Sequence, residues 1–258
     1  MPISDAGLWY DWQGPEDAPV LILSPGMGGS ASYWEPNLPA LSAQFRVLLY
    51  DHRGTGRSDR SLPGEVTLGT MADDVLGLMS ELGIDQPNFM GHALGGLIGL
   101  ELELAHFALR KLIIVNGWDK LDPYFARCFE IRLELLRKSG PAAYVRAQPI
   151  FLYPAGWISE NIDRLDAEAQ HQLVNFPPLE SLEKRIAAAK AFAPLHDITG
   201  PVLVIGAADD MLVPVKCSRE LADNLAVADY AEMSWGGHAC NVTDPATFNR
   251  IVLDFLRS

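Results

Sequence analysis

Short apolar runs and segments of helical periodicity alternate along most of the chain. Continuous apolar runs such as LIIV and VLVIG suit strands that are buried on both faces of a parallel sheet. The alternation therefore predicts an α/β fold, in which helices cover a mostly parallel sheet. The predicted strands are Val20–Ser24, Phe45–Tyr50, Asn88–Met90, Leu112–Asn116, Val202–Ala207 and Asp229–Ser234. The predicted helices between or after them are Thr70–Leu82, Leu94–His106, Lys216–Asn224 and Pro245–Leu256.

The alternation stops between residues 118 and 195, where no strand pattern is found. FARCFEIRLELLRKSG, PAAYVRAQ and LESLEKRIAAAKAF favour helices, and Gly140 and the Pro177–Pro178 pair break them. Because a strand pattern resumes at Val202, we predict a core of residues 1–117 and 196–258 with a helical cap inserted at residues 118–195. The alternative is that these helices only pack on the sheet.

Composition and charge narrow the class of partner. The chain has 258 residues, 48% of them hydrophobic, and 20 basic against 33 acidic residues give a net charge of −13. An acidic surface repels nucleic acid and anionic membranes. No apolar stretch reaches the roughly 18 residues that span a bilayer, and the N-terminal segment lacks a signal-peptide pattern. We therefore expect a cytoplasmic protein with a small-molecule substrate and neither nucleic acid nor membrane as partner, and leave a homodimer open.

The cysteines predict neither disulfides nor a metal site. Cys128, Cys217 and Cys240 are odd in number and far apart, and no CxxC or HxxxH spacing occurs. We expect a reducing compartment, no structural metal and no cofactor.

The first candidate for chemistry is the turn GHALG at residues 91–95, between a predicted strand and a predicted helix. This is the context of the nucleophile elbow, in which glycines allow strand and helix to approach closely. The central residue here is Ala93, whose methyl group cannot attack a carbonyl. Taken alone, the motif without serine favours an ordinary strand-to-helix turn.

A glycine-rich loop, SPGMGGSASYW at residues 24–34, follows the strand Val20–Ser24. Such a loop can direct backbone N–H groups toward a developing negative charge. We expect the N–H groups of Met27 and Leu94 to form an oxyanion hole. The alternative, a merely flexible glycine loop, is equally consistent with this segment.

The remaining candidates lie after the last two predicted strands. Asp209 and Asp210 follow Val202–Ala207, and His238 follows two glycines after Asp229–Ser234. Ligand sites of α/β proteins lie at this end of the strands. We expect one aspartate to orient His238 and the other to cap a helix or turn, with Asp210 preferred for the histidine. Cys240 is expected to be a small buried hydrophobe.

Together these segments resemble the α/β-hydrolase superfamily. DHRGTGRSD (Asp51–Asp59) is similar to a family motif, and the order elbow, acid, histidine is the family order. The resemblance implies an eight-stranded, mostly parallel sheet with a cap after the sixth strand. GHALG, VNGW, AQPIFLYPAGW and GGHACNVTDP are also similar to a subgroup that acts in uracil degradation and likewise carries alanine in the elbow. That subgroup implies hydrolysis of aminoacrylate or carbamate.

Ala93 departs from the serine, aspartate or cysteine of most of the superfamily. If it is native, it leaves space for a water that His238, oriented by Asp210, could activate as general base. Candidate pocket residues are Asn116, Tyr153 and Trp157, with packing an equal alternative for the two aromatic residues. His92 is a lower-ranked second acid or base.

Three other interpretations stay open. One is a cofactor-free oxygenase on the same fold, which also relies on a His–Asp pair. Another is a non-catalytic member that binds a ligand. The third is a serine hydrolase that carries a nucleophile-to-alanine substitution at Ala93.

Overall fold

The computed structural model describes residues 2–62, 64–105, 107, 109–192 and 198–258. Its centre is a seven-stranded sheet in the order β1-β3-β2-β4-β5-β6-β7. β1 pairs antiparallel with β3, and every other neighbouring pair is parallel. The strands are β1 (Tyr10–Gln13), β2 (Val20–Ser24), β3 (Arg46–Tyr50), β4 (Asn88–His92), β5 (Lys111–Val115), β6 (Val202–Ala207) and β7 (Ala228–Met233).

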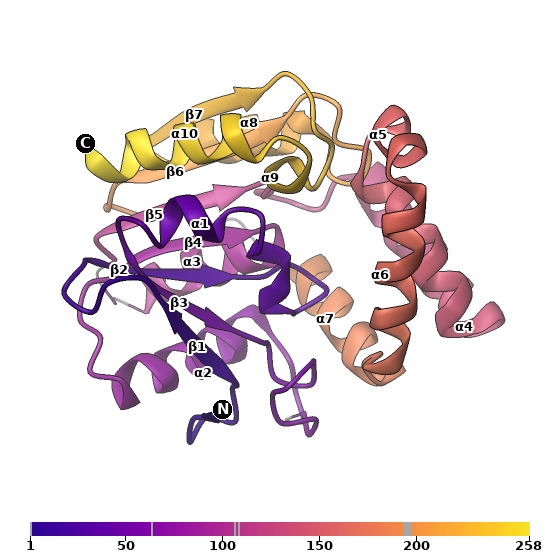
Figure 1. Cartoon of the computed structure of the whole chain (residues 1–258), viewed down its shortest axis with the longest axis horizontal. Helices are drawn as coiled ribbons and strands as arrows, with labels where there is room; N and C mark the ends of the chain where they lie inside the picture. Colours follow the sequence, from indigo (N-terminus) through magenta and orange to yellow (C-terminus); the bar gives the residue numbers. More distant parts are fainter. Residues whose placement is uncertain (1, 63, 106, 108, 193–197) are drawn as a thin grey trace.

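Helices cover both faces of this sheet (Figure 1), as the continuous apolar strands require. Alternate side chains of β5 show the division: Leu112 and Ile114 pack with one layer, whereas Ile113 and Val115 pack with the other. The first layer contains α2 (Leu68–Glu81), α3 (Leu94–Leu104) and α8 (Val215–Asn224). The second contains the 3-10 turn Ala31–Trp34, α1 (Leu38–Leu41), α9 (Cys240–Thr243) and α10 (Pro245–Arg257).

The expected α/β class and α/β-hydrolase fold are confirmed, but the expected eight strands are wrong for the described residues. β1 was not predicted, because it is a four-residue edge strand whose half-exposed side chains lack an apolar run. Before it, the chain makes only an isolated antiparallel bridge between Ile3 and Trp9 within the described residues. Gly7, with a φ of 76°, turns the chain between them, so no ladder of a further strand develops.

Between β5 and β6 the chain forms α4 (Pro123–Leu152), α5 (Ala155–Glu160), α6 (Ile162–Val174) and α7 (Leu179–Ala191). We call these four helices the helical insertion. In Figure 1 they stand together at one end of the sheet, beyond the ends of the strands. α5 and α6 were not predicted, and α4 bends at Gly140, where φ is 81° and ψ is −179°. The predicted domain boundary at 195/196 and the predicted helix end at His106 fall outside the described residues, so the proposed division into core and cap stays a prediction.

Candidate active site

The elbow after β4 has a strained backbone. Ala93, between β4 and α3, has a φ of 48° and a ψ of −112°, a region that residues other than glycine rarely adopt. A Cβ on Gly91 would lie 2.1 Å from the carbonyl carbon of Gly95, and one on Gly95 would lie 2.5 Å from the carbonyl oxygens of Ser24 and Pro25. Glycine is thus required at both positions, and the turn has the form of a nucleophile elbow.

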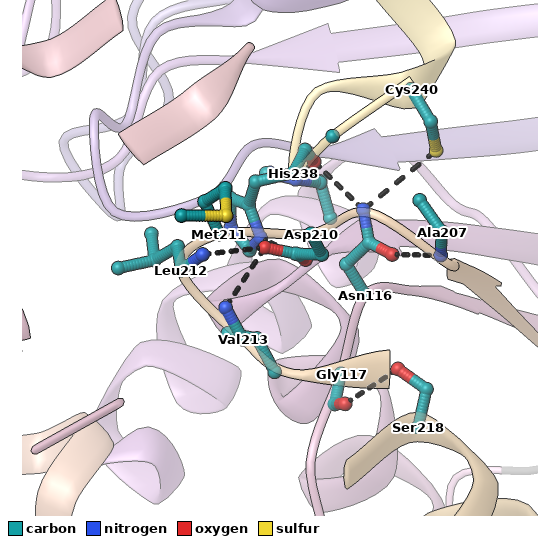
Figure 2. Close-up of polar contacts among 12 residues, drawn as sticks. Asn116, Gly117, Ala207, Asp210, Met211, Leu212, Val213, Ser218, His238 and Cys240 are labelled. Atoms are coloured by element: carbon teal, nitrogen blue, oxygen red, sulfur yellow. Dashed lines mark hydrogen bonds and ion pairs between the residues drawn. The ribbon is translucent and has the colours of Figure 1, made fainter. Parts of the chain in front are cut away.

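A buried histidine–aspartate pair lies at the same end of the sheet. His238 Nδ1 is 2.7 Å from Asp210 Oδ2, and the two side chains are only 4% and 1% exposed. Asp210 Oδ1 accepts hydrogen bonds from the N–H groups of Leu212 (2.7 Å) and Val213 (2.9 Å) (Figure 2). The carboxylate therefore fixes the histidine tautomer with the proton on Nδ1, and Nε2 is left as a base.

Asp209 binds the backbone of the loop that carries His238, which we call the histidine loop. Its Oδ1 accepts a hydrogen bond of 2.8 Å from the N–H of Gly237, the residue before His238. The sequence predicted a helix or turn cap for the second aspartate, whereas the structure joins it to a loop 28 positions further along the chain. The two adjacent aspartates thus bind the same loop, Asp210 through the ring of His238 and Asp209 through the backbone of Gly237.

Asn116 ties the ends of β5 and β6 to this loop (Figure 2). Its Oδ1 accepts from Ala207 N–H at 3.0 Å, and its Nδ2 donates to the carbonyl of His238 at 2.7 Å. Both ends of the amide are therefore occupied by backbone groups, and the side chain is buried. This geometry favours a positioning role over the predicted one of lining a pocket.

His92 binds the same carbonyl. Its Nε2 lies 2.8 Å from His238 O, and its ring lies 4.5 Å from the ring of Tyr33 and 4.6 Å from that of His238. Burial, aided by the neighbouring His238, holds the pKa of His92 well below its usual value of 6.5. The ring is neutral and points into the fold, so it supports His238 rather than facing a substrate.

The two expected oxyanion donors are free within the described residues. Leu94 is the first residue of α3, so its N–H has no acceptor within the helix. Neither the Leu94 N–H nor the Met27 N–H donates to another described residue. The loop that leads to Met27 packs against the elbow, since a Cβ on Gly26 would lie 2.6 Å from Nδ1 of His92. The arrangement is suited to stabilising negative charge above Ala93.

Comparison with known proteins shows which family the chain belongs to. Residues 19–130 match the family model described as the alpha/beta hydrolase fold. "Putative carbamate hydrolase RutD" of Caulobacter vibrioides is 51% identical over 97% of this chain and 95% of that protein. The protein of the same name from Rhizobium rhizogenes is 49% identical over 94% of each chain. The chain belongs to the RutD family of α/β hydrolases. Among solved structures, the enol-lactonase from Burkholderia xenovorans LB400 superimposes with a TM-score of 0.86 at 30% identity, covering 97% of this chain and 96% of that one.

Tyr153 and Trp157 form a stack in this member of the RutD family. Their ring centroids are 4.6 Å apart, with an angle of 29° between the planes. Tyr153 lies beside the histidine loop, because a Cβ on Gly237 would lie 3.3 Å from its Cα, and burial raises its pKa to about 12. Trp157 packs on Tyr153 and lies 5.6 Å from the Arg164 guanidinium. Their contact with a substrate stays a prediction.

Cys240 does not replace the absent serine. Its thiol is fully buried, and burial together with the charge of Asp210 raises its pKa to about 12. A thiol with such a pKa does not supply the thiolate that a nucleophilic cysteine requires.

In the described part of the chain, no group of three or more histidine, cysteine, aspartate or glutamate side chains could hold a metal ion. Within the same residues, no helix is long and apolar enough to cross a bilayer.

The sequence interpretation missed two buried arginines, Arg132 on α4 and Arg185 on α7. Each stands on the apolar face of its helix. Arg185 follows Leu182 by three positions and precedes Ile186, and Arg132 follows Cys128 and Phe129 by four and three positions. That spacing was visible in the sequence and could have indicated that both arginines point inward.

Proposed function

We propose that this chain hydrolyses a small, labile C–N compound of pyrimidine breakdown, aminoacrylate or carbamate, by means of a water activated by His238. The observation that carries the proposal is the buried His238–Asp210 pair beside an elbow that presents the methyl group of Ala93. The name carbamate hydrolase, which the relatives carry, supports the same class of reaction.

The reaction needs no covalent enzyme intermediate. His238 Nε2 takes a proton from water, and the water oxygen adds to the trigonal carbon that bears nitrogen. The Met27 and Leu94 N–H groups donate to the heteroatom that gains negative charge. The imidazolium then returns its proton to the nitrogen, and in carbamate the C–N bond breaks and ammonia leaves. In the imine this first proton gives only the amine of a carbinolamine, so His238 also carries the proton of the new hydroxyl to the nitrogen before the C–N bond breaks, the carbonyl forms and ammonia leaves. Carbamate gives bicarbonate, and aminoacrylate, which reacts as its imine tautomer, gives 3-oxopropanoate.

The size of these effects matches a labile substrate. General-base catalysis typically contributes about 10²- to 10⁴-fold in rate. Loss of one oxyanion-hole donor typically costs about 10²- to 10³-fold. Rate enhancements of this order are enough to accelerate an imine or a carbamate that already decays in water, and too small for a stable amide.

Ammonia release tests the proposal, with aminoacrylate and carbamate each generated in situ and spontaneous decay as the baseline. We expect the parent chain to exceed the baseline, and His238→Ala to fall to it. His171→Ala is the matched control, because it removes an exposed imidazole on α6. Release at the baseline rate with all three proteins would contradict hydrolysis of these substrates, and a ligand-binding role would then be favoured.

The nucleophile position separates this mechanism from that of a disabled serine hydrolase. We expect the parent to show no covalent adduct by mass spectrometry during turnover. Ala93→Ser tests the alternative, because an intact serine-hydrolase site would then cleave simple esters with a burst of acyl-enzyme. Ester cleavage that appears only in the variant would indicate that Ala93 had interrupted a covalent mechanism.

A further inference from the structure

Arg132 is a buried charge without a counter-ion among the described residues. Its side chain comes from α4, and the residue is 4% exposed. Nη2 donates to the Tyr144 hydroxyl at 3.1 Å and to Gln148 Oε1 at 2.6 Å, both of which are uncharged acceptors. Nε and Nη1 are buried and have no hydrogen-bond partner within the described residues. Three of the five guanidinium N–H donors are therefore unpaired.

Three exposed arginines of the helical insertion are paired with a carboxylate. Arg127, Arg137 and Arg164 are all about half-exposed or more, and each has a glutamate within reach. The other buried arginine of the insertion, Arg185, donates to the backbone carbonyls of Met27 and Arg53. Arg132 differs from it in that two of its guanidinium nitrogens have no partner among the described residues. A guanidinium stays charged at any physiological pH, and burying it without an anion is costly. The described residues thus supply no anion to Arg132, and its unpaired nitrogens are suited to binding an anionic ligand.

On either side of Arg132, α4 contacts the two loops that carry the candidate catalytic residues. These are the loop of Asp210, which we call the acid loop, and the histidine loop. One turn before it on α4, Cys128 Sγ lies 3.9 Å from the carbonyl of Met211, the residue after Asp210. One turn after Gln148, the carbonyl of Leu152 accepts a hydrogen bond of 3.0 Å from Ala239, the residue after His238. One helical turn is about 5.4 Å long. The guanidinium therefore lies between the parts of α4 that contact the acid loop and the histidine loop.

Aromatic rings close the space around the guanidinium. The centroids of Phe129, Tyr144 and Phe151 lie 5.6, 5.5 and 5.6 Å from its central carbon. Phe151 directly precedes Leu152, which is bound to the histidine loop. For an anion to reach Nη1 or Nε, one of these rings must rotate, and the desolvated environment would then strengthen the charge-assisted hydrogen bonds of that anion.

We propose that Arg132 binds the carboxylate of the substrate, an inference that rests on the proposed function. The chemistry then separates the two candidates. In aminoacrylate the carboxylate is distinct from the carbon that bears nitrogen, so one end can be held while water adds to the other. In carbamate a single carbon is both the carboxylate carbon and the reacting centre. An anchor remote from the reacting carbon therefore selects aminoacrylate.

Binding of acrylate, which keeps the carboxylate and lacks the amine, tests Arg132 without turnover. Isothermal calorimetry compares the parent with Arg132→Met, Arg132→Lys and the control Arg137→Met, which removes an exposed arginine of the same helix. We expect Arg132→Met to weaken binding about 10- to 100-fold, as the loss of charge-assisted hydrogen bonds would. The affinity of Arg132→Lys for acrylate should lie between those of the parent and Arg132→Met, and the affinity of Arg137→Met should match that of the parent. Equal binding by parent and Arg132→Met, or no binding by either, would overturn the proposal.

Turnover gives a second and separable test. With ammonia release as the readout, we expect Arg132→Met to lose the preference of the parent for aminoacrylate over its methyl ester, mainly through KM. A preference that survives the substitution would refute the anchor. If the parent accelerates neither compound but binds acrylate through Arg132, the hydrolase proposal fails and the carboxylate site stands. Thermal unfolding checks the variant, since methionine in place of an unpaired buried charge should not lower Tm.

Discussion

His52 illustrates how single buried side chains hold the loops around the elbow. It follows β3, is 3% exposed, and its Nε2 lies 2.9 Å from the carbonyl of Pro25 in the glycine-rich loop. Burial, with a smaller contribution from the charge of Arg185, lowers its pKa to about 3. The ring is therefore neutral at physiological pH and donates its Nε2 proton to Pro25. This bond helps to fix the loop that carries Met27.

The depressed pKa of His52 predicts a loss of stability in mild acid. The unfolded chain takes up a proton near pH 6.5, whereas the folded chain does so only near pH 3. The stabilisation is thus present above pH 6.5 and is lost as the pH falls from there toward 3. Between pH 7 and pH 5 this group should remove about 2 kcal/mol from the free energy of unfolding.

Urea unfolding of His52→Gln at both pH values checks this expectation. The amide can still donate to Pro25 but does not titrate, so the variant should lose about 2 kcal/mol less than the parent over this range. His171→Gln, an exposed position, should behave as the parent does. Equal losses in the parent and His52→Gln would show that His52 does not carry this pH dependence.

At the scale of elements, one residue sets the direction of α4. Gly140 has a φ of 81° and a ψ of −179°, a combination that essentially only glycine adopts. It interrupts the helix between the segment that carries Arg132 and the segment that carries Tyr144 and Gln148. The bend lets the two halves face each other, which is why Nη2 of Arg132 can reach both acceptors.

Two glycines with equal space but different backbones test this bend. A Cβ would meet nothing within 4 Å at Gly140 or at Gly156 in α5, and only Gly140 has a positive φ. Gly140→Ala should therefore destabilise the chain by about 1–3 kcal/mol through strain alone. Gly156→Ala should be neutral or stabilising by up to about 1 kcal/mol. Urea unfolding measures both, and equal effects would contradict the role of the positive φ.

At the scale of the whole molecule, the helical insertion contacts three loops that form the candidate site. Leu152 O accepts from Ala239 of the histidine loop, and Tyr124 Oη donates to Met211 O of the acid loop at 2.9 Å. Arg185 on α7 donates to the carbonyls of Met27 and Arg53, with 3.4 Å to Met27. The insertion therefore closes over the end of the sheet where the elbow lies, and it holds the oxyanion loop directly.

Arg185→Met should separate activity from stability. Arg185 is 1% exposed and has no carboxylate partner within the described residues, and burial lowers its pKa to about 10. Its replacement frees the Met27 loop, so we expect kcat/KM for ammonia release to fall about 10-fold, mainly in kcat. Tm should change little, because no buried carboxylate loses its partner.

Lys190→Met, at a more exposed cation of the same helix, is the control for Arg185→Met and should change neither quantity. A fall in Tm that accounts for the whole loss of activity would instead make Arg185 a purely structural residue.

Much of this architecture follows from local sequence. The apolar runs predicted β2, β3, β4, β5 and β6 within a few residues of their observed ends, because strands buried on both faces must be continuously apolar. The edge strand β7 was also predicted, although its partly exposed residues form no such run. The elbow was recognisable because only glycine fits where Gly91 and Gly95 approach each other. His238 and the aspartate pair were recognisable because ligand sites of α/β folds follow the carboxyl ends of strands.

Tertiary structure alone decided the rest. The sequence favoured Asp210 but did not decide between the adjacent Asp209 and Asp210. The folded loops place Asp210 on the ring of His238 and Asp209 on the backbone of Gly237. The edge strand β1 exists because β3 offers it hydrogen bonds, and Asn116 takes its partners from segments distant in the chain. Arg132 meets Tyr144 and Gln148 because α4 bends at Gly140. Local sequence determined which elements form, since it fixes backbone preference and apolar pattern. Packing determined which polar groups are paired, because hydrogen-bond partners are brought together only when the elements fold against one another.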